Sequence, residues 1–274
     1  MPRATGADAG FRRSDRSQSP TPRTGRGRRA RGVLGRLTHL LLPPACSGCG
    51  CALPAEIEYL CPGCRTRLRP PAHPRCFRCH APRGTGLPAE RPCPECEDWP
   101  PILEGARAAC VMAPPAGSLV HALKYGGWRE LAPTMAEGMV RALGPIDLPA
   151  DAIVAPVPTT RARLRARGFN QAEELSRAVA HSLDRVHLNP LRREGESGTQ
   201  VALHRHERRA NVERAFRPAE RSGSKVAGRY IVLVDDVLTT GATACAAAAT
   251  LGAMGAAKVT LLTFARALPD EDGG

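Results

Sequence analysis

The chain has 274 residues and a formal net charge of +13, which leaves room for one substantial domain and a smaller module. No stretch is long and apolar enough to span a membrane as a helix, so we expect a cytoplasmic protein. The charge is unevenly distributed, because residues 1–32 hold nine Arg and two Asp among many Pro, Ser, Thr and Gly. This composition predicts a disordered basic tail, which either contacts nucleic acid or another acidic surface or is a solubilising extension.

A short apolar stretch, Val33–Leu42, follows the tail. It is interrupted by Arg36 and His39, and Pro43 and Pro44 come directly after it. A signal peptide requires an uninterrupted apolar core, so the pattern favours a short amphipathic helix that leads into the next module.

Four Cys-x-x-Cys pairs lie between residues 46 and 96 and use eight of the eleven cysteines of the chain. The segment holds few large apolar residues, so we expect metal ions to take the place of a core. Two thiolates separated by two residues can bind one side of a tetrahedral zinc ion. We therefore predict a leading helix and a double zinc ribbon over residues 33–103, with two structural Zn²⁺ ions bound by Cys46, Cys49, Cys61, Cys64, Cys76, Cys79, Cys93 and Cys96.

The spacing leaves the assignment of these cysteines to the two ions open. Gaps of eleven, eleven and thirteen residues favour one zinc site from the first two pairs and another from the last two. A cross-braced arrangement is the alternative, and Cys51 is close enough to the first pair to replace Cys49. Cys76–His80 has the form of a c-type haem attachment site, but the three other pairs lack the histidine, which favours zinc.

From residue 104 the hydrophobic pattern becomes that of an α/β domain, which we assign to residues 104–268. Residues 269–274 are expected to be a second disordered tail, and the polar segment Glu194–Arg209 a long mobile loop. We expect helices at Leu131–Leu143, Asn170–Leu183 and Thr243–Met254. We expect strands at Ala106–Met112, Ile153–Ala155, Val186–Leu188, Ile231–Val234 and Val259–Phe264.

The most informative segment of the chain is Tyr230–Thr243. Its apolar, β-branched strand is followed at once by Asp235 and Asp236 and then by a turn of hydroxyl-bearing and small residues, Thr239, Thr240, Gly241, Ala242 and Thr243. Ligands of parallel sheets bind at the carboxyl ends of the strands, and the free N–H groups of a helix N-terminus suit a phosphate. Two adjacent carboxylates suit the vicinal hydroxyls of a sugar, so the segment predicts a site for a ribose 5-phosphate group. No Gly-x-x-x-x-Gly-Lys-[Ser/Thr] sequence is present, which argues against a P-loop NTPase.

This series resembles the loop of type I phosphoribosyltransferases that binds PRPP (5-phosphoribosyl 1-diphosphate). Together with the cysteine pairs it resembles the competence protein F (ComF) family, because the further motifs of that family follow in order: Leu123–Gly126, Pro156–Pro158, Arg167–Gln171, Asn211 and Ala215–Phe216. The resemblance covers about residues 34–268. It implies a parallel-sheet, phosphoribosyltransferase-like α/β domain behind a double zinc ribbon, and a link to DNA uptake during natural transformation.

The resemblance also implies roles for individual residues. The catalytic residues Asp235 and Asp236 would hold the ribose hydroxyls, the Thr/Gly-rich turn would bind the 5-phosphate, and Mg²⁺ would bind together with PRPP. The loop after an earlier strand would bind the diphosphate, through Pro156, Val157, Pro158, Arg161 and Arg163. The polar segment after Glu194 is expected to be either an ordinary surface loop or a lid that carries Gln200, Arg205, Arg208 and Arg209.

Two functions fit these features. The first is an enzyme that transfers the phosphoribosyl group of PRPP to an acceptor that the sequence does not identify, mainly by positioning and electrostatics. The second is a non-catalytic protein that senses PRPP or handles single-stranded DNA as a partner of competence and helicase proteins. In that case the basic tail, the ribbons and the arginine-rich loop would bind the phosphate backbone.

Overall fold

The computed structural model describes residues 44–54, 56–57, 59–83, 91–144, 146–194 and 215–268. The predictions for the basic tail, the leading helix and the C-terminal tail therefore lie outside the described residues. The described residues belong to one compact unit that begins at Leu42, so the cysteine-rich module and the sheet form a single body. Within this part of the chain, no helix has the length and apolar character needed to cross a membrane.

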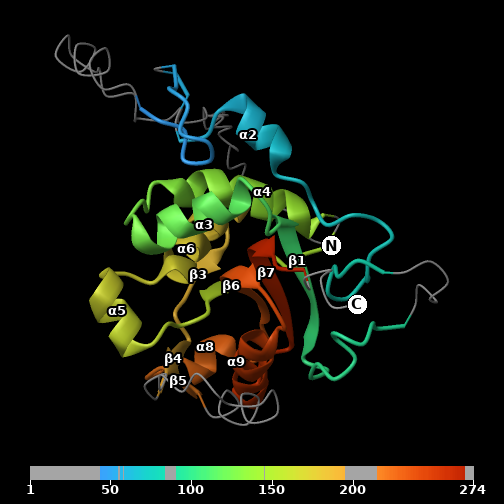
Figure 1. The fold of residues 1–274 in the computed structure, drawn as a ribbon. Helices are drawn as coiled ribbons and strands as arrows, with labels where there is room; N and C mark the ends of the chain where they lie inside the picture. The colour runs from blue at the N-terminus through green and yellow to red at the C-terminus, as the bar shows by residue number, and fades with distance from the viewer. Residues whose placement is uncertain are drawn as a thin grey trace, which may run out of the picture. The chain divides into compact units, whose positions relative to one another are not determined.

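A five-stranded parallel sheet with the strand order β1-β7-β6-β2-β3 forms the larger domain (Figure 1). Its strands are β1 (Leu103–Val111), β2 (Ile153–Pro156), β3 (Val186–His187), β6 (Tyr230–Leu238) and β7 (Lys258–Arg266). A small antiparallel sheet, which the sequence did not predict, pairs β4 (Leu191–Arg193) with β5 (Phe216–Pro218). The predicted parallel α/β sheet is thus confirmed.

Helices cover both faces of the large sheet. One face is covered by α3 (Ala116–Tyr125), α4 (Leu131–Leu143) and α6 (Gln171–Leu183), and the other by α9 (Ala242–Ala253), as Figure 1 shows. Three shorter helices complete the described chain, namely α2 (Pro62–Arg67), α5 (Arg161–Arg167) and α8 (Gly223–Val226).

The central strand β6 explains why its sequence is a continuous apolar run. Val232 and Val234 point into the core beneath α4 and α6, whereas Ile231 and Leu233 point into the core beneath α9. All four side chains are fully buried, because successive residues of a strand face opposite sides and both sides are covered here. Burial of each such side chain contributes roughly 1.5–3 kcal/mol of hydrophobic free energy.

The cysteine-rich module is organised by two groups of four cysteines. The first cysteine group is Cys46, Cys49, Cys61 and Cys64, and the second cysteine group is Cys76, Cys79, Cys93 and Cys96. Within each group the four sulfur atoms lie within 4.8 Å of one another. This grouping agrees with the sequential assignment of the pairs and not with a cross-braced one, and it includes Cys49 rather than Cys51.

The geometry of both groups suits a tetrahedral metal ion. The Sγ–Sγ distances are 3.8 Å for Cys49–Cys61, 3.7 Å for Cys76–Cys96 and 3.4 Å for Cys79–Cys93. Four thiolates at about 2.3 Å from a zinc ion would lie about 3.8 Å apart. Burial acts to raise the pKa of the Cys46 thiol, but backbone N–H groups of Cys61 and Gly48 donate to its sulfur and lower the pKa to about 6.

The two cysteine groups pack against opposite faces of the sheet. Cys46 and Cys64 belong to the core that contains α3 and α4, whereas all four residues of the second cysteine group are buried in the core that contains α9. The second group also joins the edge strand β1, because the backbone N–H of Ala106 donates to the carbonyl of Arg78 at 2.7 Å. Gly105 permits this approach, since a Cβ there would lie 2.5 Å from the same carbonyl oxygen.

We predict two zinc ions per chain, measured by metal analysis of protein purified under reducing conditions. Each group offers four sulfur ligands, and structural zinc contributes directly to the free energy of folding. Cys49→Ser and Cys79→Ser should each lose about one zinc, and chelation should lower the melting temperature.

Cys51→Ser provides the matched control, because Cys51 adjoins the first cysteine group without belonging to it. This variant should keep both ions. A wild-type content of one zinc or none, or a loss of zinc from Cys51→Ser but not from Cys49→Ser, would contradict the assignment.

Candidate functional site

The two adjacent carboxylates lie where β2 separates from β6. Strand β6 is longer than predicted, so Asp235 and Asp236 lie inside it rather than after it. The pairing of β2 with β6 ends at Pro156 and Val234, whereas β6 continues beside β7 as far as Leu238. Beyond Val234, the edge of β6 that pairs with β2 therefore has no partner strand in the described chain.

This separation coincides with a reversal in the winding of the chain. The first long helix after β2 is α6, which comes after the short α5 and packs on one face of the sheet. The helix that follows β6 is α9, on the opposite face. Ligands of open parallel sheets bind outside the carboxyl ends of the strands at such a switch point. The topology therefore predicts a binding site at Asp235 and Asp236, which is called the crevice below.

The turn Thr239–Thr243, called the phosphate loop below, leads from β6 into α9. Thr239 and Thr240 are exposed, while Gly241 is buried and has a φ of 81°, which favours glycine. Helix α9 begins at Ala242, one residue earlier than expected, and Gly241 at its N-cap has no side-chain acceptor. The N–H of Ala242 lies 3.5 Å from Thr240 Oγ1. The free N–H groups in the first turn of a helix can bind an anion.

A lysine neutralises one of the two carboxylates. Lys124 Nζ, near the end of α3, lies 2.7 Å from Asp236 Oδ2, and both side chains are largely buried. The backbone N–H of Asp236 donates to Asp235 Oδ1 at 2.8 Å. Burial and the neighbouring Asp236 carboxylate raise the pKa of Asp235 to about 7, although this amide and Lys124 act in the opposite direction. Asp235 is thus the less compensated of the two acids.

An arginine that the sequence analysis missed lies close to this acid. Arg193, in β4, is partly buried, and its Cζ lies 5.4 Å from the centroid of the Phe216 ring. Burial and the nearby Arg163 lower the pKa of Arg193, whereas the charge of Asp235 raises it. The small antiparallel sheet thus brings a third element to the crevice. No sequence motif marked this residue, because β4 is only three residues long.

The proposed diphosphate loop follows β2 and is tied to β6. The backbone N–H of Val157 donates to the carbonyl of Val234 at 2.8 Å. Thr160 Oγ1 accepts the N–H of Arg163 at 3.2 Å and caps α5, which has no buried residue, so its arginines face solvent. Asn170 stands at the start of α6 as expected but does not cap it, because its Nδ2 donates to the carbonyl of Val157 at 3.1 Å.

Pro156 and Pro158 border this loop, and Arg161 is exposed on α5. The structure therefore brings the predicted diphosphate loop and phosphate loop to the same edge of the sheet. The four predicted lid residues, Gln200, Arg205, Arg208 and Arg209, lie outside the described residues.

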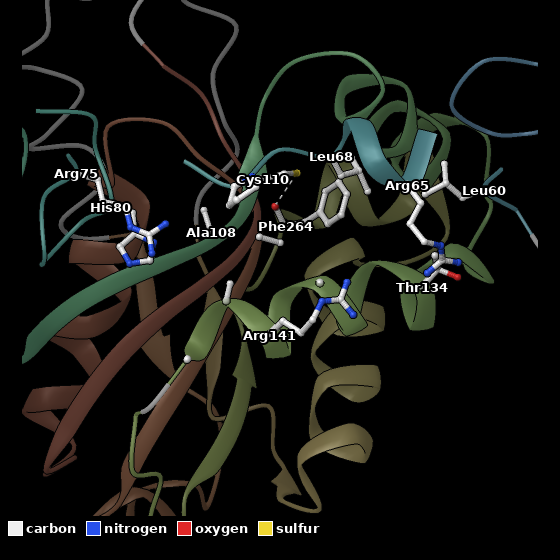
Figure 2. A pocket seen from close by; sticks show the side chains of 15 residues that line it. Leu60, Arg65, Leu68, Arg75, His80, Ala108, Cys110, Thr134, Arg141 and Phe264 are labelled. Carbon is white, nitrogen blue, oxygen red and sulfur yellow. Dashed lines mark hydrogen bonds between the residues drawn. The ribbon is translucent and has the colours of Figure 1, made fainter. Parts of the chain in front are cut away.

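A separate cavity of about 330 Å³ contains none of these predicted site residues. Figure 2 shows Phe264 and Cys110 in its middle, with His80 and Arg75 at one end and Arg65 at the other. Two of its guanidinium groups already have protein partners, since Arg65 pairs with Glu137 and Arg75 donates to the carbonyl of Pro71. The cavity is therefore a less convincing anion site than the crevice.

Two family models match the chain and agree with this organisation. Residues 37–97 match the model of the double zinc ribbon domain, and residues 164–272 match that of the phosphoribosyl transferase domain. Among solved structures, the chain resembles that of the allosteric regulatory enzyme of purine biosynthesis, with 16% identity, a TM-score of 0.33, and coverage of 49% of this chain and 25% of that one. It also resembles TT1426 of Thermus thermophilus, with 18% identity, a TM-score of 0.32, and coverage of 52% and 86%.

The curated relatives are named DNA utilization protein YhgH or competence protein F. DNA utilization protein YhgH of Salmonella typhimurium is 32% identical over 230 residues, which cover 81% of this chain and 90% of that protein. The Escherichia coli O6:H1 protein of the same name is 33% identical over 193 residues, or 67% and 82% of the two chains. Competence protein F of Haemophilus influenzae is 36% identical over 115 residues, or 42% and 50%. The chain therefore belongs to the competence protein F (ComF) family and combines a double zinc ribbon with a phosphoribosyl transferase domain.

Proposed function

We propose that the chain binds Mg²⁺-PRPP in the crevice between β2 and β6 and transfers its phosphoribosyl group to an acceptor. The observation that carries this proposal is the position of Asp235 and Asp236 beside the phosphate loop, at the point where β2 leaves the sheet. The match to the phosphoribosyl transferase domain supports it.

The chain's own residues would act mainly by binding and electrostatics. Asp235 and Asp236 would accept hydrogen bonds from the 2- and 3-hydroxyls of the ribose, while the N–H groups at the start of α9 would bind the 5-phosphate. As the acceptor attacks C1, the bond from C1 to the diphosphate oxygen breaks and the diphosphate leaves with the electron pair. Positive charge develops on the ribose in this transition state, and the two carboxylates would stabilise it.

The distribution of charge in the crevice also suits a bound divalent cation. Among the described residues, the two carboxylates have one close ion-pair partner, Lys124, and the pKa of Asp235 is raised. Carboxylate and phosphate oxygens are the hard ligands that Mg²⁺ prefers, so these residues fit the metal–diphosphate form of the ligand. When bound, Mg²⁺ would supply positive charge to the leaving diphosphate. Arg163 and Arg193 would add further positive charge to the same region.

A second candidate function is the handling of single-stranded DNA without turnover. The specific observation is the exposed surface of α5, which carries four arginines, one of them beside the exposed Tyr125. Arg167 Cζ lies 4.9 Å from the ring centroid of Tyr125, and Trp128 is 44% exposed. Arginines and aromatic rings together suit a phosphate backbone and unstacked bases. The names of the YhgH relatives favour a role with DNA.

DNA binding that weakens steeply with salt and is lost in Arg161→Ala with Arg165→Ala would support this second function. If the same binding persists in Asp235→Asn with Asp236→Asn, the DNA surface is independent of the crevice. Diphosphate release from labelled PRPP in the presence of a panel of acceptors tests the enzyme directly.

Both functions are compatible with a cytoplasmic location, which we also propose. All eleven cysteines lie in the described residues, and none forms a disulfide. Free and zinc-bound thiols are typical of a reducing compartment.

Mg²⁺-PRPP should raise the melting temperature of the protein, because a ligand that binds only the folded state stabilises it by mass action. At a concentration of 100 Kd the gain is about 2.7 kcal/mol, which corresponds to a shift of several degrees. Asp235→Asn with Asp236→Asn should remove most of this shift. The control is Asp147→Asn, at an exposed aspartate, and an undiminished shift in the double variant would refute the assigned role.

The unliganded protein should also lose stability through Asp235 as the pH rises. The folded-state pKa of about 7 lies above the unfolded value of about 3.9, so the folded state holds this proton more tightly. This contribution is fully present below about pH 3.9 and is lost as the pH rises through 7. The melting temperature of Asp235→Asn relative to the wild type should therefore increase between pH 5 and pH 8. A constant difference across this range would count against the raised pKa.

A further inference from the structure

One side chain connects the second cysteine group to the phosphate loop. Trp99 follows the ligand Cys96 by three residues and is only 5% exposed. A Cβ on Gly241 would lie 2.6 Å from Trp99 Cζ2 and 2.9 Å from Trp99 Cε2. The indole ring therefore lies directly against the backbone of Gly241, the residue whose positive φ turns the chain into α9.

The position of Trp99 is fixed by an arginine that lies between two metal ligands. Arg78 Nη1 donates to the carbonyl of Cys96 at 2.7 Å, and Arg78 Nη2 donates to the carbonyl of Trp99 at 3.1 Å. The guanidinium Cζ also lies 5.9 Å from the centroid of the Trp99 ring. Arg78 thus joins both halves of the second cysteine group to the segment that carries the tryptophan.

A second arginine ties the same group to β7, which pairs with the strand that leads into the loop. Arg266 is 1% exposed, its Nη1 donates to the carbonyl of Cys79 at 2.9 Å, and its Nη2 pairs with Glu95 at 2.6 Å. In the sheet, Arg266 is the register partner of Leu238, the residue immediately before the phosphate loop. The second cysteine group is therefore linked to the loop at Gly241 through Trp99, and it supports the strand pair from which the loop starts.

Regular structure does not supply this support. No helix or strand is present in the described residues 69–83 and 91–102, so the buried cysteines define the local geometry. The first cysteine group differs, because it packs with α3 and α4 on the other face of the sheet. A Cβ on its Gly48 would meet Pro115, at the end of α3 remote from Lys124. The first cysteine group therefore serves as a comparison for the second within the same chain.

We infer that Trp99 is a positioning residue for the phosphate loop, and that metal in the second cysteine group preorganises this loop through the contact of Trp99 with Gly241. The ordering of the phosphate loop is inferred from the contacts of Trp99 alone and does not depend on which ligand the loop binds. The consequence for ligand affinity rests on the proposed function: a loop already held in its binding conformation costs less to order when Mg²⁺-PRPP binds.

The test compares Trp99→Leu with Phe77→Leu, which removes a 50% exposed aromatic ring from the same ribbon. Amide exchange over residues 239–244 in the unliganded protein should become at least tenfold faster in Trp99→Leu and stay unchanged in Phe77→Leu. The dissociation constant for Mg²⁺-PRPP, measured by calorimetry, should rise about tenfold in Trp99→Leu only. Both variants should retain two zinc ions. Cys79→Ser should loosen the loop as Trp99→Leu does, whereas Cys49→Ser should not.

The amide-exchange measurement tests the inference about Trp99, and the binding measurement tests the proposed function on which that inference builds. Unchanged exchange in a zinc-loaded Trp99→Leu protein overturns the inference, whether or not PRPP binds. A wild-type protein that does not bind Mg²⁺-PRPP refutes the proposed function, and the exchange comparison still decides the role of Trp99.

A fluorescence measurement covers the case in which Trp99→Leu does not fold. The chain has two tryptophans, so Trp128→Phe leaves Trp99 as the only indole emitter. Its emission should shift to longer wavelength in Cys79→Ser and not in Cys49→Ser, because loss of metal from the second cysteine group would release the ring from the loop. An emission that stays unchanged in Cys79→Ser overturns the inference.

Discussion

The site depends on the electrostatic cost of placing two adjacent carboxylates at the end of a buried strand. The Asp236 carboxylate is paired with Lys124 from α3, and a backbone amide donates to the Asp235 carboxylate. This compensation is incomplete, because the pKa of Asp235 is still raised to about 7. A ligand that brings a cation and sugar hydroxyls would relieve the remaining cost. The arrangement therefore favours a metal–phosphoribosyl ligand over a simple anion.

The cysteine-rich module extends both cores of the domain rather than standing beside them. Its two cysteine groups close opposite faces of the sheet, and the second reaches the phosphate loop through Trp99. A metal site that is remote in sequence thus becomes a structural part of the crevice. This arrangement gives a physical reason for the presence of both modules in one chain.

The elements that could be predicted are those whose pattern lies within one short segment of the sequence. The run Ile231–Val234 is apolar at every position because both faces of β6 are buried, and the cysteine spacing directly reflects two four-ligand groups. Helix α5 was missed because it has no buried face and therefore no hydrophobic period. The contacts of Arg193 with its surroundings and of Trp99 with Gly241 join segments that are distant in the chain, so no local pattern indicates them.

The most direct test of the account is a crystal structure of the zinc-loaded protein grown with Mg²⁺-PRPP. The account predicts the 5-phosphate on the N–H groups of the phosphate loop, the ribose hydroxyls on Asp235 and Asp236, and the diphosphate beside Arg163. Binding of PRPP in the separate cavity near His80 and Arg141, or a crevice in which the two carboxylates do not contact the ribose, would contradict it.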